Sequence, residues 1–208
     1  PARETDNTND YGVKKIDMKV NDNNYISWTN SFMRNFGIGI SQKIEINSEL
    51  CELIGIWLAE GSSNGSQITF TINQKEENFK NRIIELMWKV FSLDNYSISE
   101  RKGSLALNIS YSSKQLIEFF KQLFEVQNLK DVNQWNKFIP KKLLHIEPKM
   151  QMQIFKGWFI GDGWAATPAS AKREAKGTTV SQKLADDMIF ILNRNFINPF
   201  IQKEERAN

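Results

Sequence analysis

Two acidic residues end two similar apolar stretches of this chain of 208 residues. Glu60 ends LIGIWLAE at residues 53–60, and Asp162 ends FKGWFIGD at residues 155–162. The two acids are 102 residues apart (162 − 60). A carboxylate in the last turn of a helix faces the negative end of the helix dipole, which costs about 0.3–1 kcal/mol. An acid at this position in both stretches therefore requires a reason other than helix stability.

Small residues recur four positions apart in both stretches. Gly55 and Ala59 precede the first acid, and Gly157 and Gly161 stand at the matching positions before the second. Such spacing forms a flat strip on a helix, and two strips let helix backbones approach closely. If the helices pack side by side and in parallel, their last turns meet and the acids come together. Two carboxylates repel each other unless a cation lies between them, and oxygen ligands favour a hard ion such as Mg²⁺.

A glycine follows each acid, Gly61 in the first stretch and Gly163 in the second. Glycine readily adopts the left-handed conformation that ends many helices. The sequence therefore predicts that each helix ends at a left-handed glycine, which turns the chain away.

These residues resemble a known family. LIGIWLAEG and FKGWFIGDG are similar to the paired motifs of the LAGLIDADG homing endonucleases, and LAEGS and GDG are most similar to the versions carried inside inteins. NKFIP, at residues 136–140, resembles the Lys-x-Ile-Pro block that precedes the second motif in intein-type members. The resemblance extends from about residue 50 to about residue 200.

The resemblance implies a metal-dependent endonuclease that hydrolyses phosphodiester bonds of double-stranded DNA at a long recognition site. Glu60 and Asp162 would be catalytic and would bind Mg²⁺, with the backbone carbonyls of Ala59 and Gly161 as further ligands. Lys137, in the NKFIP block, resembles the basic residue that polarises the attacking water or neutralises the phosphate. An ordinary surface lysine is the alternative for Lys137. A cleavage-deficient relative that acts as an RNA maturase or a DNA-binding regulator is the alternative for the whole chain.

The fold implied by the resemblance is α+β, in a monomer with internal pseudo-two-fold symmetry. Two half-domains of αββαββα type would pair their motif helices and present an antiparallel DNA-binding saddle. Residues 51–135 would form the first half-domain and residues 136–208 the second, after an N-terminal extension or linker at residues 1–50. The second half is expected to be shortened and incomplete, since 46 residues (208 − 162) follow its acid.

Patterns of apolar residues indicate the elements that surround the motifs. Strict alternation predicts a strand at residues 67–75 with Ile68, Phe70 and Ile72 inward, and a hairpin at residues 97–111 with Leu105, Leu107 and Ile109 inward. Two strands around a loop are expected within residues 163–182. Helices are expected at residues 23–38, 77–91, 113–126 and 183–196, with further strands at residues 39–46 and 198–206.

The other face of the first strands is polar. Such a face is often only solvated in an antiparallel sheet, but the resemblance implies that it contacts base edges in the DNA major groove, where each base pair shows a distinct pattern of donors and acceptors. Lys172 and Arg173 lie in the loop of the second half and would contact phosphates, with a solvated loop as the alternative. The remaining candidate contacts are Gln67, Thr69, Thr71, Asn73, Lys75, Arg101 and Lys102.

Composition excludes several classes of site. Cys51 is the only cysteine and His145 the only histidine, so an intrachain disulfide, a Cys/His zinc site and a catalytic Ser-His triad are not expected. The net charge of +3 permits a nucleic-acid partner without requiring one. The sequence shows neither a run of ~20 apolar residues nor the apolar core of a signal peptide. An intracellular location is expected, cytoplasmic, organellar or nuclear according to the host.

Overall fold

The computed structural model describes residues 19–21, 25–27, 40–101, 103–167 and 174–203. Within these ranges the chain is an α+β protein with antiparallel sheets, as expected. Its elements in chain order are β1 (Lys19–Asn21), β2 (Tyr25–Ser27), β3 (Lys43–Glu45), α1 (Ser48–Glu60), β4 (Gly61–Ser63), β5 (Ile68–Asn73), α2 (Glu77–Phe91), β6 (Ser97–Glu100), β7 (Ala106–Tyr111), α3 (Lys114–Phe124), the short 3-10 helices Leu129–Asp131 and Lys141–Leu143, α4 (Pro148–Asp162), β8 (Gly163–Ala165), β9 (Ala175–Gly177) and α5 (Gln182–Arg194).

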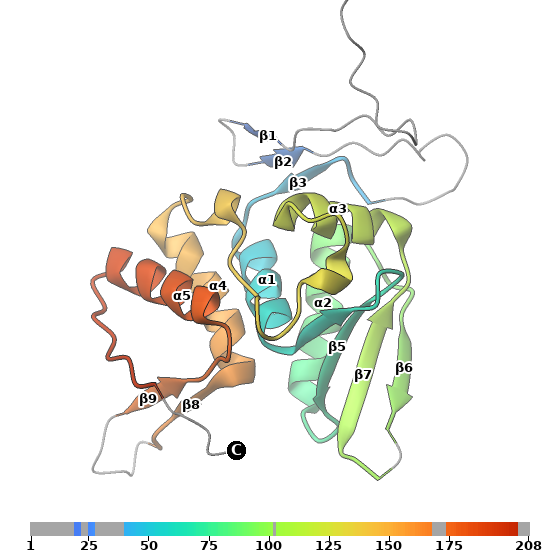
Figure 1. Ribbon diagram of the computed structural model, residues 1–208. Helices are drawn as coiled ribbons and strands as arrows, with labels where there is room; N and C mark the ends of the chain where they lie inside the picture. Colours follow the sequence, from blue (N-terminus) through green and yellow to red (C-terminus); the bar gives the residue numbers. More distant parts are fainter. Residues whose placement is uncertain (1–18, 22–24, 28–39, 102, 168–173, 204–208) are drawn as a thin grey trace, which may run out of the picture.

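The two motif stretches form α1 and α4, which lie side by side at the centre of the molecule (Figure 1). Helix α1 begins where the side chain of Asn47 accepts a hydrogen bond of 2.9 Å from the amide of Leu50, which satisfies one of the free donors of the first turn. Helix α4 begins at Pro148, whose missing N–H costs nothing at this position. Nine successive residues of α1, 50–58, are buried, so this helix lies inside the core of the protein.

A four-stranded sheet with the order β4-β5-β7-β6 follows α1 and lies on the opposite side of it from α4 and α5 (Figure 1). Ile68, Phe70 and Ile72 are buried, as the alternation predicts. Leu107 and Ile109 are also buried, but Leu105 is 48 % exposed, which contradicts its predicted inward position. The pairing of β7 with β5 ends at Ala106, so Leu105 lies beyond the sheet.

An aromatic cluster joins α3 to the inner side of α1. The ring of Trp57 contacts Phe120 and Phe124 of α3, with centroid distances of 5.4 and 4.7 Å. Phe91, the last residue of α2, contacts Phe119 at 5.2 Å. Such ring pairs contribute about 0.5–1.5 kcal/mol beyond the apolar area that they bury. The helices α1, α2 and α3 therefore share one core with the sheet.

The second motif helix is followed by the two strands β8 and β9 and by α5. This agrees with the two strands predicted within residues 163–182 and with the helix predicted at residues 183–196. The expected strand at residues 198–206 is absent from its described part, residues 198–203. Phe196 has a φ of 60°, so the chain leaves α5 through a left-handed residue, and Pro199 lacks a backbone donor for a sheet.

The N-terminal described residues form a small sheet with the order β1-β2-β3. The strand β3 agrees with the prediction at residues 39–46, but Tyr25–Ser27 is a strand where a helix was expected, because it pairs with β1 and β3. Most of that predicted helix lies outside the described residues. The amide of Ile40, just before β3, donates a 2.7 Å hydrogen bond to the side chain of Gln115, which joins this segment to α3.

The glycines after the acids are not left-handed, so the predicted helix ends are wrong in conformation. Gly61 has φ −84° and ψ 147°, and Gly163 has φ −107° and ψ 158°, both extended. Each glycine instead begins a strand directly. A Cβ on Gly61 would lie 2.2 Å from the ring of Trp57, and one on Gly163 would lie 2.2 Å from the carbonyl oxygen of Phe159. Glycine is needed at both positions for space rather than for a positive φ.

In the part of the chain that the structure describes, no helix combines the length and the apolar character that crossing a membrane requires.

Candidate active site

The helices α1 and α4 touch backbone to backbone. A Cβ on Gly55 would lie 2.1 Å from the carbonyl oxygen of Ile154, and a Cβ on Gly157 would lie 2.1 Å from the carbonyl oxygen of Glu52. Real Cβ atoms essentially never approach another atom within 3.0 Å, so only glycine fits at either position. The close approach expected from the small residues is therefore present.

This approach brings the two acids together at the ends of the helices. A Cβ on Gly161 would lie 2.7 Å from the Cβ of Ala59 and 2.8 Å from Oε1 of Glu60. The carboxylate of Glu60 therefore lies against the residue that precedes Asp162. Both acids are partly buried, and no side chain on Gly161 separates them.

Lys137 lies at the same place, although its own segment is an irregular loop between α3 and α4. Its side chain is only 7 % exposed, which contradicts the alternative of an ordinary surface lysine. Nζ donates hydrogen bonds of 3.2 Å to the carbonyl oxygens of Trp57 and Ala59, in the last turn of α1. A cation at the C-terminal end of a helix is favourably placed relative to the helix dipole. Lys137 therefore binds two carbonyls beside Glu60, of which that of Trp57 also accepts a hydrogen bond from the amide of Gly61.

Two hydrogen bonds hold the Lys137 loop against α5 and against Ser181, the residue that precedes this helix. The hydroxyl of Ser181 donates a 2.6 Å bond to the carbonyl oxygen of Lys137. The amide of Ile139 donates a 2.9 Å bond to the carboxylate of Asp187. Because Ser181, Ile139 and Asp187 are all buried, the loop is fixed by both its main chain and its packing.

Burial dominates the electrostatics of the site. It raises the pKa of Glu60 to about 7, with further increases from the charges of Asp162 and Glu76 and a decrease from Lys137. Burial also raises the pKa of Asp162, against the opposing effects of a hydrogen bond from Trp158 and of Lys137. The pKa of Lys137 falls to about 8 because burial outweighs the attraction of both acids. Ionised acids are therefore unfavourable here without a further positive charge.

The oxygen ligands fit a hard divalent cation that also binds a substrate. Among the described residues, no group of three or more His, Cys, Asp or Glu side chains is placed to hold a metal ion. Mg²⁺ is usually bound by one or two carboxylates together with substrate phosphates rather than by an all-protein cage. Glu60 and Asp162 meet that description. The carbonyl of Ala59, also predicted as a ligand, already accepts a hydrogen bond from Lys137.

The acid pair should make the stability of the metal-free protein depend on pH. Because the folded-state pKa of Glu60 lies near 7 and its ordinary value is 4.5, the folded protein binds more protons between these values, and stability should fall as pH rises from about 4.5 to about 7. Glu60→Gln should reduce this fall, gaining on the order of 1–2 kcal/mol at pH 8, and the raised pKa of Asp162 should leave a smaller fall. Urea unfolding of both proteins at pH 5 and pH 8 measures it. If both proteins lose the same free energy of unfolding between pH 5 and pH 8, the raised pKa of Glu60 is contradicted.

The predicted DNA-contact residues of the first half share one polar sheet face. Gln67, Thr69, Thr71 and Asn73 alternate with the buried residues of β5. On this face the hydroxyls of Thr69 and Ser110 lie 2.9 Å apart, and the hydroxyl of Thr71 donates a 2.9 Å hydrogen bond to Asn108 of β7. Lys75 and Arg101 are exposed after the ends of β5 and β6. Lys102, Lys172 and Arg173 lie outside the described residues.

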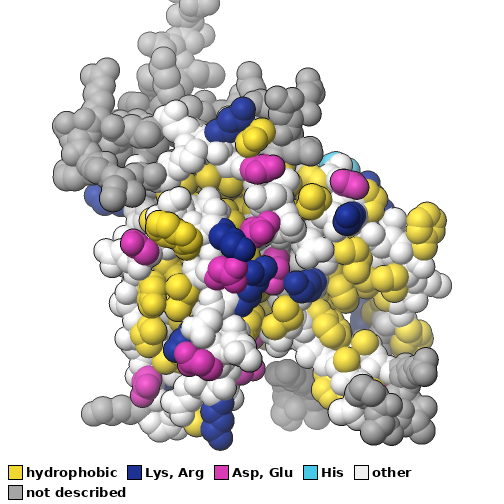
Figure 2. Space-filling view, turned by 180° about the vertical axis from the view of Figure 1, so that it is seen from behind, with side chains coloured by type: hydrophobic (Ala, Val, Ile, Leu, Met, Phe, Trp, Pro, Cys, Tyr) yellow, Lys and Arg dark blue, Asp and Glu magenta, His cyan; other side chains and the backbone are white. Residues whose placement is uncertain are grey.

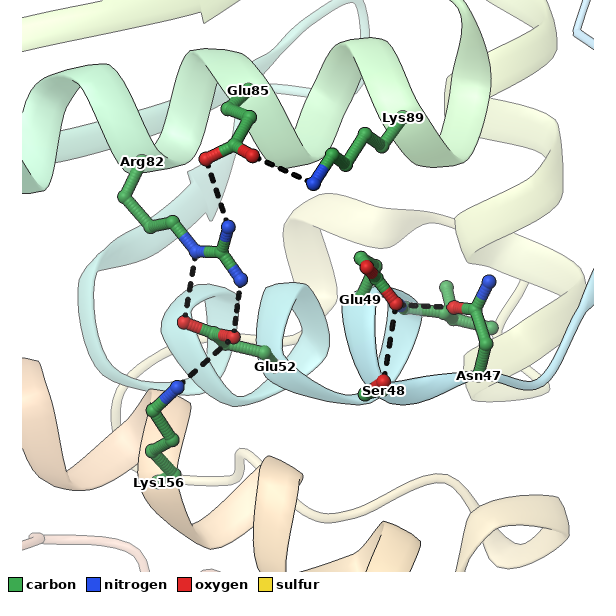
Figure 3. Close-up of polar contacts among 9 residues, drawn as sticks. Asn47, Ser48, Glu49, Glu52, Arg82, Glu85, Lys89 and Lys156 are labelled. Atoms are coloured by element: carbon green, nitrogen blue, oxygen red, sulfur yellow. Dashed lines mark hydrogen bonds and ion pairs between the residues drawn. The ribbon is translucent and has the colours of Figure 1, made fainter.

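A cluster of charges that sequence reasoning missed joins three helices. Glu52 of α1 is only 3 % exposed and accepts hydrogen bonds of 3.1 and 2.7 Å from Arg82 of α2 and one of 3.3 Å from Lys156 of α4 (Figure 3). Burial raises the pKa of Glu52, but its two cationic partners hold it below the ordinary value. Arg82 also pairs with Glu85, which pairs with Lys89. The only sequence signal was an acid within an apolar helix.

Charges of both signs also mix over the face of the protein shown in Figure 2, where no large patch of one sign is visible. Neighbouring charges of opposite sign cancel at a distance, so this face does not offer the basic surface that attracts phosphates.

Comparisons with known proteins find relatives in sequence and in structure. No family model matches the chain. An uncharacterized protein of Methanocaldococcus jannaschii is 31 % identical over 193 residues, which are 90 % of this chain and 22 % of that protein. A second uncharacterized protein of the same organism is 27 % identical over 163 residues, 74 % of this chain and 17 % of that protein. The chain thus spans about a fifth of the length of these relatives.

Among solved structures, a variant of I-DmoI in complex with its nicked target DNA and manganese matches with a TM-score of 0.54 at 15 % identity. The match covers 77 % of this chain and 83 % of that one. I-DmoI is a LAGLIDADG homing endonuclease. The chain therefore has a fold similar to that of a LAGLIDADG endonuclease, and this confirms the expected α+β class with antiparallel sheets.

Proposed function

We propose that this chain is a site-specific homing endonuclease that hydrolyses phosphodiester bonds of double-stranded DNA at a long recognition site, with Mg²⁺ as its natural metal. The observation that carries the proposal is the meeting of Glu60 and Asp162 at the ends of two helices in backbone contact. Two half-buried acids with raised pKa values are costly unless a cation joins them. The similarity to I-DmoI, which was solved with DNA and manganese, supports the same activity.

In this proposal the two acids hold divalent metal, and the carbonyls of Ala59 and Gly161 are further ligands. The metal supplies a nucleophilic water at neutral pH and stabilises the charge on the phosphate and the leaving oxygen. Lys137 polarises the attacking water or neutralises the phosphate. The carbonyl oxygen of Ala59 has two lone pairs, so it can accept the hydrogen bond from Lys137 and still offer one lone pair to a cation.

The proposed architecture is a monomer with an internal pseudo-two-fold axis between α1 and α4. The glycine contacts support it, since Gly55 and Gly157, which are 102 residues apart, each meet a carbonyl at the corresponding place on the other helix. We assign residues 51–135 to the first half-domain, residues 136–208 to the second, and residues 1–50 to an extension. The motif variants LAEGS and GDG, with the KFIP block, support an intein-type member.

DNA would lie against the polar sheet faces. The face of β5 and β7 carries hydroxyl and amide groups from Thr69, Thr71 and Asn108, which suit the donors and acceptors of base edges. The exposed Lys75 and Arg101 at the ends of the strands suit phosphates. Gln67 and Asn73 on the same face, with Lys102, Lys172 and Arg173, complete the proposed contacts.

Binding to DNA should weaken steeply with salt. The logarithm of the association constant should fall linearly with log salt concentration, with a slope of about −0.9 for each phosphate neutralised. Lys75→Gln and Lys102→Gln should each reduce the slope by about one unit. Lys80→Gln is the matched control, because Lys80 pairs with Glu77 on α2. Filter binding across a range of salt concentrations measures the slope, and a slope near zero would point to a partner other than nucleic acid.

A search for cut sites tests the proposal directly. The protein is incubated with a plasmid library of randomised sequence and Mg²⁺ or Mn²⁺, and the cut ends are sequenced. The double variant Glu60→Gln/Asp162→Asn, treated identically, reports contaminating nucleases. Ends that share one sequence and are absent from the control support the proposal. If both proteins give the same ends, the chain is not an endonuclease under these conditions. The alternatives without cleavage, an RNA maturase or a DNA-binding regulator, are then favoured.

A further inference from the structure

The carboxylate of Asp162 has a dedicated hydrogen-bond donor from its own helix. The indole Nε1 of Trp158 donates a 3.0 Å hydrogen bond to Oδ2 of Asp162, one helical turn later. Trp158 is only 4 % exposed, so water competes little for this donor. A neutral donor on one oxygen stabilises the ionised carboxylate without cancelling its charge, and no side chain among the described residues donates to the other oxygen.

Packing fixes the orientation of the indole. A Cβ on Gly177 of β9 would lie 2.4 Å from Cη2 of Trp158, so the ring is pressed against a strand that has room only for glycine. The ring of Phe155 lies on another side, with centroids 6.0 Å apart. The amide of Thr178 also donates a 3.0 Å hydrogen bond to the carbonyl oxygen of Asp162, which joins the strand end to the helix end. The indole cannot turn away without disturbing its contacts with Gly177 and Phe155.

Among the described residues, Glu60 has no equivalent donor at the end of α1. Ile56 occupies the position 102 residues before Trp158 and carries no polar group. The end of α1 instead has Lys137, whose ammonium bonds to the carbonyls of Trp57 and Ala59. The two acids therefore share the nearby cation Lys137, but among the described residues only Asp162 also receives a hydrogen bond from a neutral side chain.

We propose that Trp158 is a positioning residue that presets the Asp162 carboxylate for a divalent cation, so that the two halves of the site bind metal and act on their DNA strands unequally. This inference rests on the proposed endonuclease function. Trp158 touches neither substrate nor metal and acts only through Asp162. Groups that hydrogen-bond to metal-binding carboxylates orient them, and their loss lowers metal affinity by about 10–100-fold.

The test compares Trp158→Phe, which keeps an aromatic ring and removes the donor, with Trp88→Phe, which removes an indole that is 54 % exposed on α2. Binding of Mn²⁺ alone is followed by the loss of the electron paramagnetic resonance signal of free Mn²⁺. We expect Trp158→Phe to weaken Mn²⁺ binding by at least tenfold and Trp88→Phe to match the wild type. If wild-type protein binds Mn²⁺ and Trp158→Phe binds it equally tightly, the inference is wrong while the proposed function stands.

A second measurement does not require Trp158→Phe to fold. The protein has six tryptophans, and ¹⁵N-labelled indoles each give an N–H signal in a nuclear magnetic resonance spectrum. Asp162→Asn should shift one of these signals strongly, because that N–H loses its carboxylate acceptor, and Glu60→Gln should leave the same signal nearly unchanged. If Asp162→Asn shifts none of the six, the hydrogen bond is absent in solution and the inference fails.

Strand-resolved nicking separates the remaining outcomes once a cut site is known. Trp158→Phe should slow cleavage of one strand at least tenfold more than cleavage of the other, whereas general loss of structure would slow both equally. Equal slowing therefore overturns the inference alone. Wild-type protein that neither binds Mn²⁺ nor cuts DNA overturns the proposed function itself, and the inference with it.

Discussion

Glu60→Gln and Asp162→Asn should each reduce DNA cleavage by orders of magnitude and leave the fold intact. Each change keeps the shape of the side chain and removes the charge that holds the cation. A bound metal contributes several kcal/mol of charge stabilisation in the transition state, and each 1.36 kcal/mol is a factor of ten in rate, so a loss of about 10²–10⁴-fold is expected. Nicking of a supercoiled plasmid that carries the cut site measures the rate.

Folding and DNA binding should survive these changes, which distinguishes loss of chemistry from loss of structure. Burial raises the pKa values of both acids, so removing either charge should not destabilise the metal-free protein near neutral pH. Fewer negative charges near phosphates should also leave DNA affinity equal or higher. Glu49→Gln, in the first turn of the same helix as Glu60, is the matched control and should cut normally. Normal cutting by Glu60→Gln would make the central assignment wrong.

The two motif helices were predictable because the signals that define them are local. Gly55 and Gly157 mark a close approach through their spacing and their lack of a side chain, and the acids mark the ends of the helices. Both features depend on a helical period rather than on distant partners. The strand β5 was predictable for the same reason, since its alternation over six residues matches burial at every second position.

The errors lie where a segment depends on its partner. The alternation that places Leu107 and Ile109 inward extends to Leu105, but the strand pairing begins only at the next residue, Ala106. The segment at residues 25–27 has apolar residues that suit a helix, yet it pairs as a middle strand between β1 and β3. Short strands take their identity from neighbours, which a single sequence does not show.

The sequence pointed to the residues of the candidate site, but it did not indicate most of their contacts. The NKFIP block drew attention to Lys137, but its hydrogen bonds to the carbonyls at the end of α1 follow from a loop held by Ser181 and Asp187, far along the chain. The spacing of Trp158 and Asp162 was visible in the sequence. A tryptophan one turn before an acid does not by itself predict a hydrogen bond between them. The bond depends on Gly177 of β9, which fixes the ring and which the local spacing does not reveal.

Gly157→Ala should strongly destabilise the protein, although alanine is normally the better helix former by about 1 kcal/mol. The added methyl group would lie 2.1 Å from the carbonyl oxygen of Glu52 and 2.9 Å from the amide nitrogen of Ile56. These are backbone atoms of α1, so the helices must separate to accommodate it. Overpacking of this kind costs about 1–3 kcal/mol and sometimes more, and with no flexible neighbour to yield we expect at least about 3 kcal/mol.

Urea unfolding measures this loss, with Ile160→Ala as the control on the same helix, because Ile160 is exposed and its truncation should change the free energy of unfolding by only about 0.5 kcal/mol. Gly55→Ala should match Gly157→Ala, since its methyl group meets the carbonyl oxygen of Ile154 at the same 2.1 Å. The double variant should lose less than the sum of the two, because both changes separate the same pair of helices. A Gly157→Ala protein as stable as the wild type would mean that α1 and α4 do not cross at these glycines.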